Sequence, residues 1–143
     1  MSEQPDIQVV VDDHSRRVHP DSQPGFINGL LHAVHGVMHV FEHERNARVH
    51  LAFAMLAFLL GLVLKVSDVE LAAVFLAVVI VFLAEIFNTV IERTLDLIDI
   101  EENPRIKLIK DMAAGAVLVA AVASTMIGIV IFGPHILRLV WPN

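Results

Sequence analysis

The stretch LAEIFNTVIERTLD, residues 83–96, continues an apolar run that begins at Leu71 and carries it into charge. At about 100° per residue its polar side chains share one sector of a helix: Glu85, Asn88, Thr89, Glu92 and Asp96. The opposite sector stays apolar. Ionisable groups at the depth where a membrane helix leaves the hydrocarbon are costly and usually functional. The stretch therefore predicts both a membrane helix and a site on it.

The composition assigns the chain to small polytopic membrane proteins. Of its 143 residues, 56% are hydrophobic and 18% are charged, whereas soluble domains have about 25% charged residues. The net charge of −6 offers no basic stripe, which argues against nucleic-acid binding. The absence of cysteine excludes disulfides, thiolate metal sites and a cysteine nucleophile.

The chain divides into a polar tail and an all-α membrane domain, residues 25–143. Residues 1–24 are polar and contain three prolines, so we expect a disordered tail, with docking on a partner as the alternative. The domain is predicted to contain an N-terminal amphipathic surface helix and three transmembrane helices, at residues 25–48, about 49–66, 69–98 and 104–132. Asn103-Pro104 has the pattern of a helix start, and Gly133-Pro134 is predicted to end the third span.

Two features of the surface helix leave alternatives open. Its polar face carries four histidines at spacings that would also suit zinc: His32, His35, His39 and His43. We interpret this face as turned towards water or headgroups. Glu44 falls instead on the apolar side, where it could snorkel at a helix end or reach into the bundle. Inside the bundle, only a cation or a partner would make this carboxylate tolerable.

The basic residues predict the orientation. Eight of the ten lie on one side of the predicted spans, while Lys65 and Arg138 lie on the other. The positive-inside rule then places the N-terminus and the 92–110 loop in the cytoplasm, and the chain in the cytoplasmic membrane. Candidate functional groups fall in the same half of the membrane: Glu44, Glu85, Glu92, Lys110 and Asp111.

These groups could perform phosphoryl transfer at the membrane surface. Magnesium takes oxygen ligands, often one or two carboxylates plus substrate phosphates, which Glu44 and Glu92 could supply. Lys110 could balance phosphate charge, and Glu85 could act as general base on a lipid hydroxyl. The alternative is a polar helix–helix interface, in which Asn88 joins helices by hydrogen bonds.

Three segments carry a resemblance to a known family. They are ExxNTxxExxxD at residues 85–96, KDMAAGAV at 110–117 and ERNxRVH at 44–50. Together they resemble the prokaryotic diacylglycerol kinase and undecaprenol kinase family, and the likeness covers roughly residues 31–132. The segment at 44–50 is similar to the undecaprenol kinase branch.

The resemblance implies a role for each matching residue. Glu85 would be the base, and Glu44 and Glu92 would hold the Mg²⁺ of MgATP. The nucleotide and its phosphates would be lined by Asn88, Lys110 and Asp111, with Glu101, Glu102 and Asn103 near the nucleotide. It also implies a homotrimer with active sites between neighbouring subunits.

One departure concerns the surface helix, where the family usually brings basic residues towards the nucleotide. This chain has Gly25, Asn28, Leu31 and His32 at those places. His32 and His35 could substitute, or nucleotide binding could be weaker.

We therefore expect ATP-dependent phosphorylation of a membrane lipid alcohol, undecaprenol being favoured over diacylglycerol. The rival interpretations are a transport or proton-relay subunit that uses the same carboxylates, and a non-catalytic membrane subunit.

Overall fold

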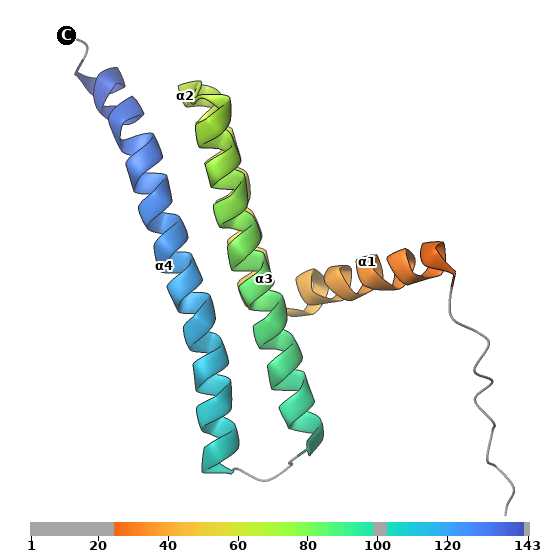
Figure 1. Ribbon diagram of the computed structural model, residues 1–143. Helices are drawn as coiled ribbons and strands as arrows, with labels where there is room; N and C mark the ends of the chain where they lie inside the picture. Colours follow the sequence, from red (N-terminus) through yellow and green to blue (C-terminus); the bar gives the residue numbers. More distant parts are fainter. Residues whose placement is uncertain (1–24, 99–102, 142–143) are drawn as a thin grey trace, which may run out of the picture.

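The structure is a computed structural model that describes residues 25–98 and 103–141. Within those ranges every secondary-structure element is an α-helix: α1 Phe26–His43, α2 Arg45–Leu64, α3 Asp68–Ile98 and α4 Pro104–Val140. Helices α2, α3 and α4 run side by side, while α1 projects sideways from them (Figure 1). The all-α class, with one N-terminal helix ahead of three long ones, is confirmed. The predicted tail, residues 1–24, lies outside the described residues.

Helices α2, α3 and α4 are each long and apolar enough to cross a membrane. A span needs about 20 residues, which α2 meets with 20, whereas α3 has 31 and α4 has 37. Large apolar side chains such as Phe53, Phe75 and Leu118 are exposed. An outward-facing apolar surface is expected where lipid, rather than water, is the solvent.

The helix junctions follow from local chemistry. Ser67 and Glu70 form a capping box at the start of α3, with the Ser67 N–H donating to Glu70 Oε2 over 2.8 Å and the Glu70 N–H donating to Ser67 Oγ. Asn103 caps α4 by accepting from the Arg105 N–H over 2.9 Å, and Pro104 occupies the first turn. The helix start predicted at Asn103-Pro104 is confirmed.

The surface helix ends earlier than the sequence predicts. Instead of continuing to residue 48, α1 stops at His43, and Glu44 adopts an extended conformation with φ −95° and ψ 120°. Helix α2 begins directly afterwards at Arg45. One extended residue is enough to turn the chain from the direction of α1 to that of the bundle.

Helix α4 does not end at Gly133-Pro134 but continues through Pro134 to Val140. A proline removes one N–H and one helical hydrogen bond, which kinks a helix without necessarily stopping it when neighbouring groups support the backbone. The residue after the proline, His135, joins this part of α4 to its own backbone and to α3. Its Nδ1 lies 2.9 Å from the Ile131 carbonyl oxygen, and its Nε2 lies 3.8 Å from Glu70 Oε2 on α3.

The core between the three long helices is built mainly from small and medium side chains. Val74, Ile131 and Phe132 form a buried cluster. Ala77 and Ala120 are also buried. Their small side chains let helix backbones approach closely. At this crossing the Ser124 hydroxyl on α4 donates to the Ala77 carbonyl on α3 over 3.0 Å.

Candidate active site

Glu85 is buried on α3 close to the point where α1 joins the bundle. The Phe41 ring of α1 packs edge-on against Phe82, one turn before Glu85, with ring centroids 5.2 Å apart. The Glu85 side chain is buried, with the residue only 2% exposed. Its Oε2 atom has no hydrogen-bond partner among the described residues. Burial of a carboxylate oxygen without a donor is costly, so this atom suits a ligand that brings a donor.

Asn88 lies one turn further along α3 and directs the Glu92 carboxylate. Its Nδ2 donates to Glu92 Oε1 over 3.0 Å. The opposite amide atom, Asn88 Oδ1, is buried and has no partner within the described ranges. Thr89, next to it, is also buried. The helical face predicted from the sequence therefore holds two unpartnered buried oxygens, one on Glu85 and one on Asn88.

Glu44 enters the same region from the break between α1 and α2. Its Oε1 accepts a hydrogen bond from Arg93 Nη2 over 2.9 Å. The sequence left open whether Glu44 snorkels or reaches into the bundle, and the structure shows that it reaches α3 and is neutralised there by a cation. The neighbouring guanidinium nitrogen, Arg93 Nη1, lies 3.1 Å from His39 Nε2 on α1.

Three separate segments converge on Glu85. The ionisable side chains of His50, Glu92 and Glu44 lie within electrostatic range of its carboxyl group. No cluster of three or more His, Asp or Glu side chains suited to a metal ion occurs in the described part of the chain. Magnesium in phosphoryl-transfer sites is typically held by one or two carboxylates plus substrate phosphates. The donor set of Glu44 and Glu92 fits that chemistry.

The predicted phosphate-binding residues lie beyond Glu92, towards the α3–α4 connection. Lys110 on α4 forms an ion pair with Asp96 on α3, which joins the two helices at this end. Asp111 is exposed, and Asn103 uses its side-chain oxygen to cap α4. Glu101 and Glu102 lie outside the described residues.

His32 is not brought to the other predicted residues within one chain. It is exposed on the projecting part of α1. It precedes Glu44 by twelve residues, which is about 18 Å along a helix. The structure therefore does not place His32 at the candidate active site of its own chain.

Sequence reasoning missed Arg93 and His50. Arg93 is one of the eight basic residues that predict the orientation, and it directly follows Glu92 and is the kind of cation that Glu44 requires. His50 is a lone polar residue in the otherwise apolar run from Val49 to Leu64. Its isolation was the available signal, because polar side chains inside spans usually face the bundle interior.

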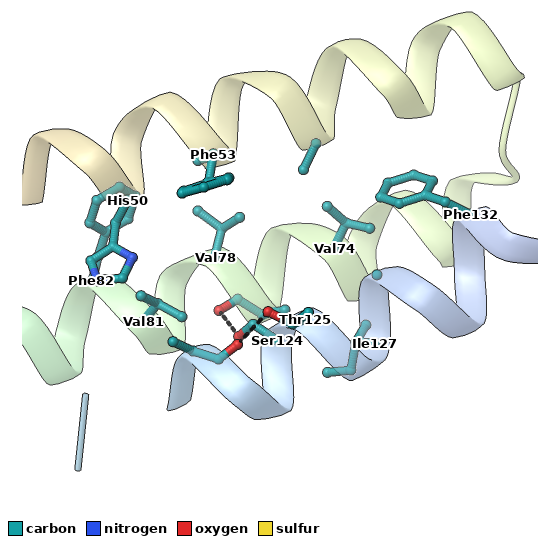
Figure 2. A pocket seen from close by; sticks show the side chains of 15 residues that line it. His50, Phe53, Val74, Val78, Val81, Phe82, Ser124, Thr125, Ile127 and Phe132 are labelled. Carbon is teal, nitrogen blue, oxygen red and sulfur yellow. Dashed lines mark hydrogen bonds between the residues drawn. The ribbon is translucent and has the colours of Figure 1, made fainter. Parts of the chain in front are cut away.

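An apolar groove of about 360 Å³ runs between α2, α3 and α4, and His50 is one of the residues that line it. His50 and Phe82 lie at one end of it and Phe132 at the other (Figure 2). Ser124 and Thr125 are its hydroxyl-bearing residues, and both hydroxyls donate to backbone carbonyls, of Ala77 and Ala121. With those hydrogen bonds satisfied, the groove presents an almost wholly apolar surface.

Comparisons with known proteins identify the family of the chain. The family model for prokaryotic diacylglycerol kinase matches residues 31–132. The undecaprenol kinase of Bacillus subtilis is 39% identical over 111 residues, which cover 78% of this chain and 90% of that protein. The diacylglycerol kinase of Synechocystis sp. is 30% identical over 117 residues, covering 81% and 67%. No solved structure matches the chain. The extent of the family match and the identity to two of its members show that this chain belongs to the prokaryotic diacylglycerol kinase family.

Proposed function

We propose that this lipid kinase transfers the γ-phosphoryl group of ATP to the hydroxyl of a membrane lipid alcohol at the cytoplasmic face of the membrane. Family membership supports the reaction class. The observation that carries the assignment of the site is the buried Glu85 carboxylate, whose Oε2 has no partner among the described residues and which lies near two further carboxylates.

Glu85 is the proposed general base. Its unpartnered Oε2 would accept the hydrogen bond, and then the proton, of the acceptor hydroxyl as the oxygen attacks phosphorus. The bond from the γ-phosphorus to the bridging oxygen breaks, and ADP leaves. Glu85 is well suited to this role because its carboxylate is buried. Water is kept away from the carboxylate and does not compete with the acceptor hydroxyl for it.

Glu44 and Glu92 are the proposed ligands of the Mg²⁺ of MgATP, an ion that neutralises phosphate charge when bound. Asn88 orients Glu92. Lys110 and Asp111 are proposed to lie along the phosphates and nucleotide, together with the segment Glu101 to Asn103. Because α1 projects away from the bundle, we further propose a homotrimer in which His32 reaches the site of a neighbour.

The acceptor is proposed to be a long-chain lipid alcohol, with undecaprenol favoured over diacylglycerol. The relative with 39% identity is an undecaprenol kinase. The apolar groove next to His50 offers a surface for hydrocarbon. Because the chain of a membrane lipid already lies in an apolar solvent, its binding there would depend on packing rather than on removal from water.

The test is turnover of labelled ATP with Mg²⁺ and a panel of lipid alcohols in mixed micelles, for wild type and Glu85→Gln. The wild type should phosphorylate undecaprenol faster than diacylglycerol. Glu85→Gln should lose about 10²–10⁴-fold in turnover and still bind MgATP. Glu42→Gln, which changes an exposed acid on α1 in the same way, serves as the matched control and should retain activity.

Wild-type turnover by Glu85→Gln would remove the base assignment. A wild type that phosphorylates no lipid alcohol, and instead conducts ions in liposomes without ATP, would favour the transport interpretation.

A further inference from the structure

The Glu44 side chain points away from the helix that it precedes. Glu44 is the N-cap residue of α2, a position where the shorter side chains of Ser, Thr, Asp and Asn commonly accept from the N–H groups of the first turn. No such capping hydrogen bond is made among the described residues. The carboxylate crosses instead to Arg93 on α3, and it is less than a third exposed.

Arg93 reaches two groups of the α1–α2 corner with the two arms of its guanidinium. Nη2 donates to Glu44 Oε1 over 2.9 Å, and Nη1 lies 3.1 Å from His39 Nε2. A guanidinium has no acceptor, so a hydrogen bond at this contact is one that Arg93 donates and His39 Nε2 accepts. The fork thus ties the end of α1 and the extended residue after it to α3.

Helix α1 offers no guanidinium or ammonium group of its own to Glu44, because residues 26–43 contain neither Lys nor Arg. The contact also has a parallel on the same helix. Asn88 holds the Glu92 carboxylate, and Arg93 holds the Glu44 carboxylate from the next turn of α3. Each of the two carboxylates proposed to bind the cation is therefore oriented by one side chain of α3.

We propose that Arg93 is a positioning residue that holds the Glu44 carboxylate towards Glu85 and Glu92 for cation binding. The inference rests on the proposed function, which assigns Glu44 as a ligand. Partners that orient a metal ligand contribute about 10–100-fold to metal affinity. Arg93 also carries a positive charge, which by itself opposes cation binding. Positioning and charge therefore predict opposite signs when Arg93 is removed.

The experiment measures Mn²⁺ binding by electron paramagnetic resonance, using the full chain in detergent micelles with a non-hydrolysable ATP analogue and no lipid acceptor. Arg93→Gln should weaken Mn²⁺ binding by about 10-fold or more. Glu44→Gln should weaken it similarly, and the double variant should bind no more weakly than Glu44→Gln alone. Arg138→Gln removes the same charge from an exposed position near the far end of α4 and should bind as wild type does.

Tighter Mn²⁺ binding by Arg93→Gln, or fully additive losses in the double variant, would overturn the inference while leaving the proposed function in place. Arg93→Lys is a second variant that tests the inference. It keeps the charge but cannot span both Glu44 and His39, so binding should fall between wild type and Arg93→Gln. If Arg93→Gln does not fold, the inference would be overturned by an Arg93→Lys variant that binds Mn²⁺ as tightly as the wild type does. A wild type that binds no Mn²⁺ with nucleotide contradicts the cation assignment itself.

Discussion

Among the individual residues, Asn88 combines a structural cost with a functional contact. Its Nδ2 holds Glu92, but its Oδ1 is buried without a partner among the described residues. An unpaired buried carbonyl costs about 1–3 kcal/mol. Asn88→Leu should therefore retain or raise the thermal unfolding midpoint, while the Mg²⁺ requirement for activity rises by about 10–100-fold. Thermal unfolding in detergent and a Mg²⁺ titration of activity measure the two effects. A parallel loss of both would contradict a separate functional role for Asn88.

Lys110 forms an ion pair with Asp96 and is also proposed to bind phosphate. Variants of the two residues separate a role of Lys110 in stability from a role in ATP binding. Asp96 is 62% exposed in this pair, and ion pairs at such positions contribute about 0–1 kcal/mol. Asp96→Asn should therefore shift the unfolding midpoint little. Lys110→Gln should raise the KM for ATP, with a smaller change in stability than in activity. The measurement is ATP saturation kinetics beside thermal unfolding. An unchanged KM for ATP in Lys110→Gln would remove Lys110 from the phosphate site.

At the scale of the helices, the sequence predicted most of what the structure contains. Apolar runs and the cap at Asn103 define where α2, α3 and α4 lie, because these signals are local in the chain. The two differences depend on contacts between elements. Helix α4 passes Pro134, where His135 contacts the helix backbone and Glu70 of α3. Glu44 breaks the predicted surface helix and pairs with Arg93, 49 residues away in the chain. Helical periodicity could place the carboxylates on faces, but not the cation that neutralises one of them.

Gly61 marks a place where two helices approach closely. A Cβ atom added there would lie 3.3 Å from Leu71 Cδ1 and 3.4 Å from Val66 Cγ2. Gly61→Val should therefore overpack the end of α2 against the start of α3, with a cost of about 1–3 kcal/mol. Gly36→Ala on α1, where no atom lies within 4 Å of an added Cβ, is the matched control and should be neutral or stabilising. Thermal unfolding of both variants in detergent tests this prediction. Equal unfolding midpoints for the two variants would show that the α2–α3 turn accommodates the larger side chain without loss of stability.

For the molecule as a whole, the arrangement of α1 keeps Glu44 at the bundle and carries the start of the helix away from it. Glu44 lies within electrostatic range of Glu85 in the same chain. His32 lies on the projecting half of α1, remote from both along the helix. If the proposed trimer shares its sites, His32 of each chain would complete the site of the next, whereas Glu44 and Glu85 would remain paired in the same chain.

Mixed oligomers distinguish these cases. Glu85→Gln should be nearly inactive, and His32→Ala should have a raised KM for ATP. Co-reconstitution of the two should give more activity at low ATP than either gives alone, because some sites would combine an intact Glu85 with an intact His32 from the neighbour. Co-reconstitution of Glu44→Gln with Glu85→Gln should restore nothing, because each chain would lack one member of its own pair. Recovery in this second mixture would show that Glu44 and Glu85 serve a common site from different chains. No gain in the first mixture would place His32 outside the active site.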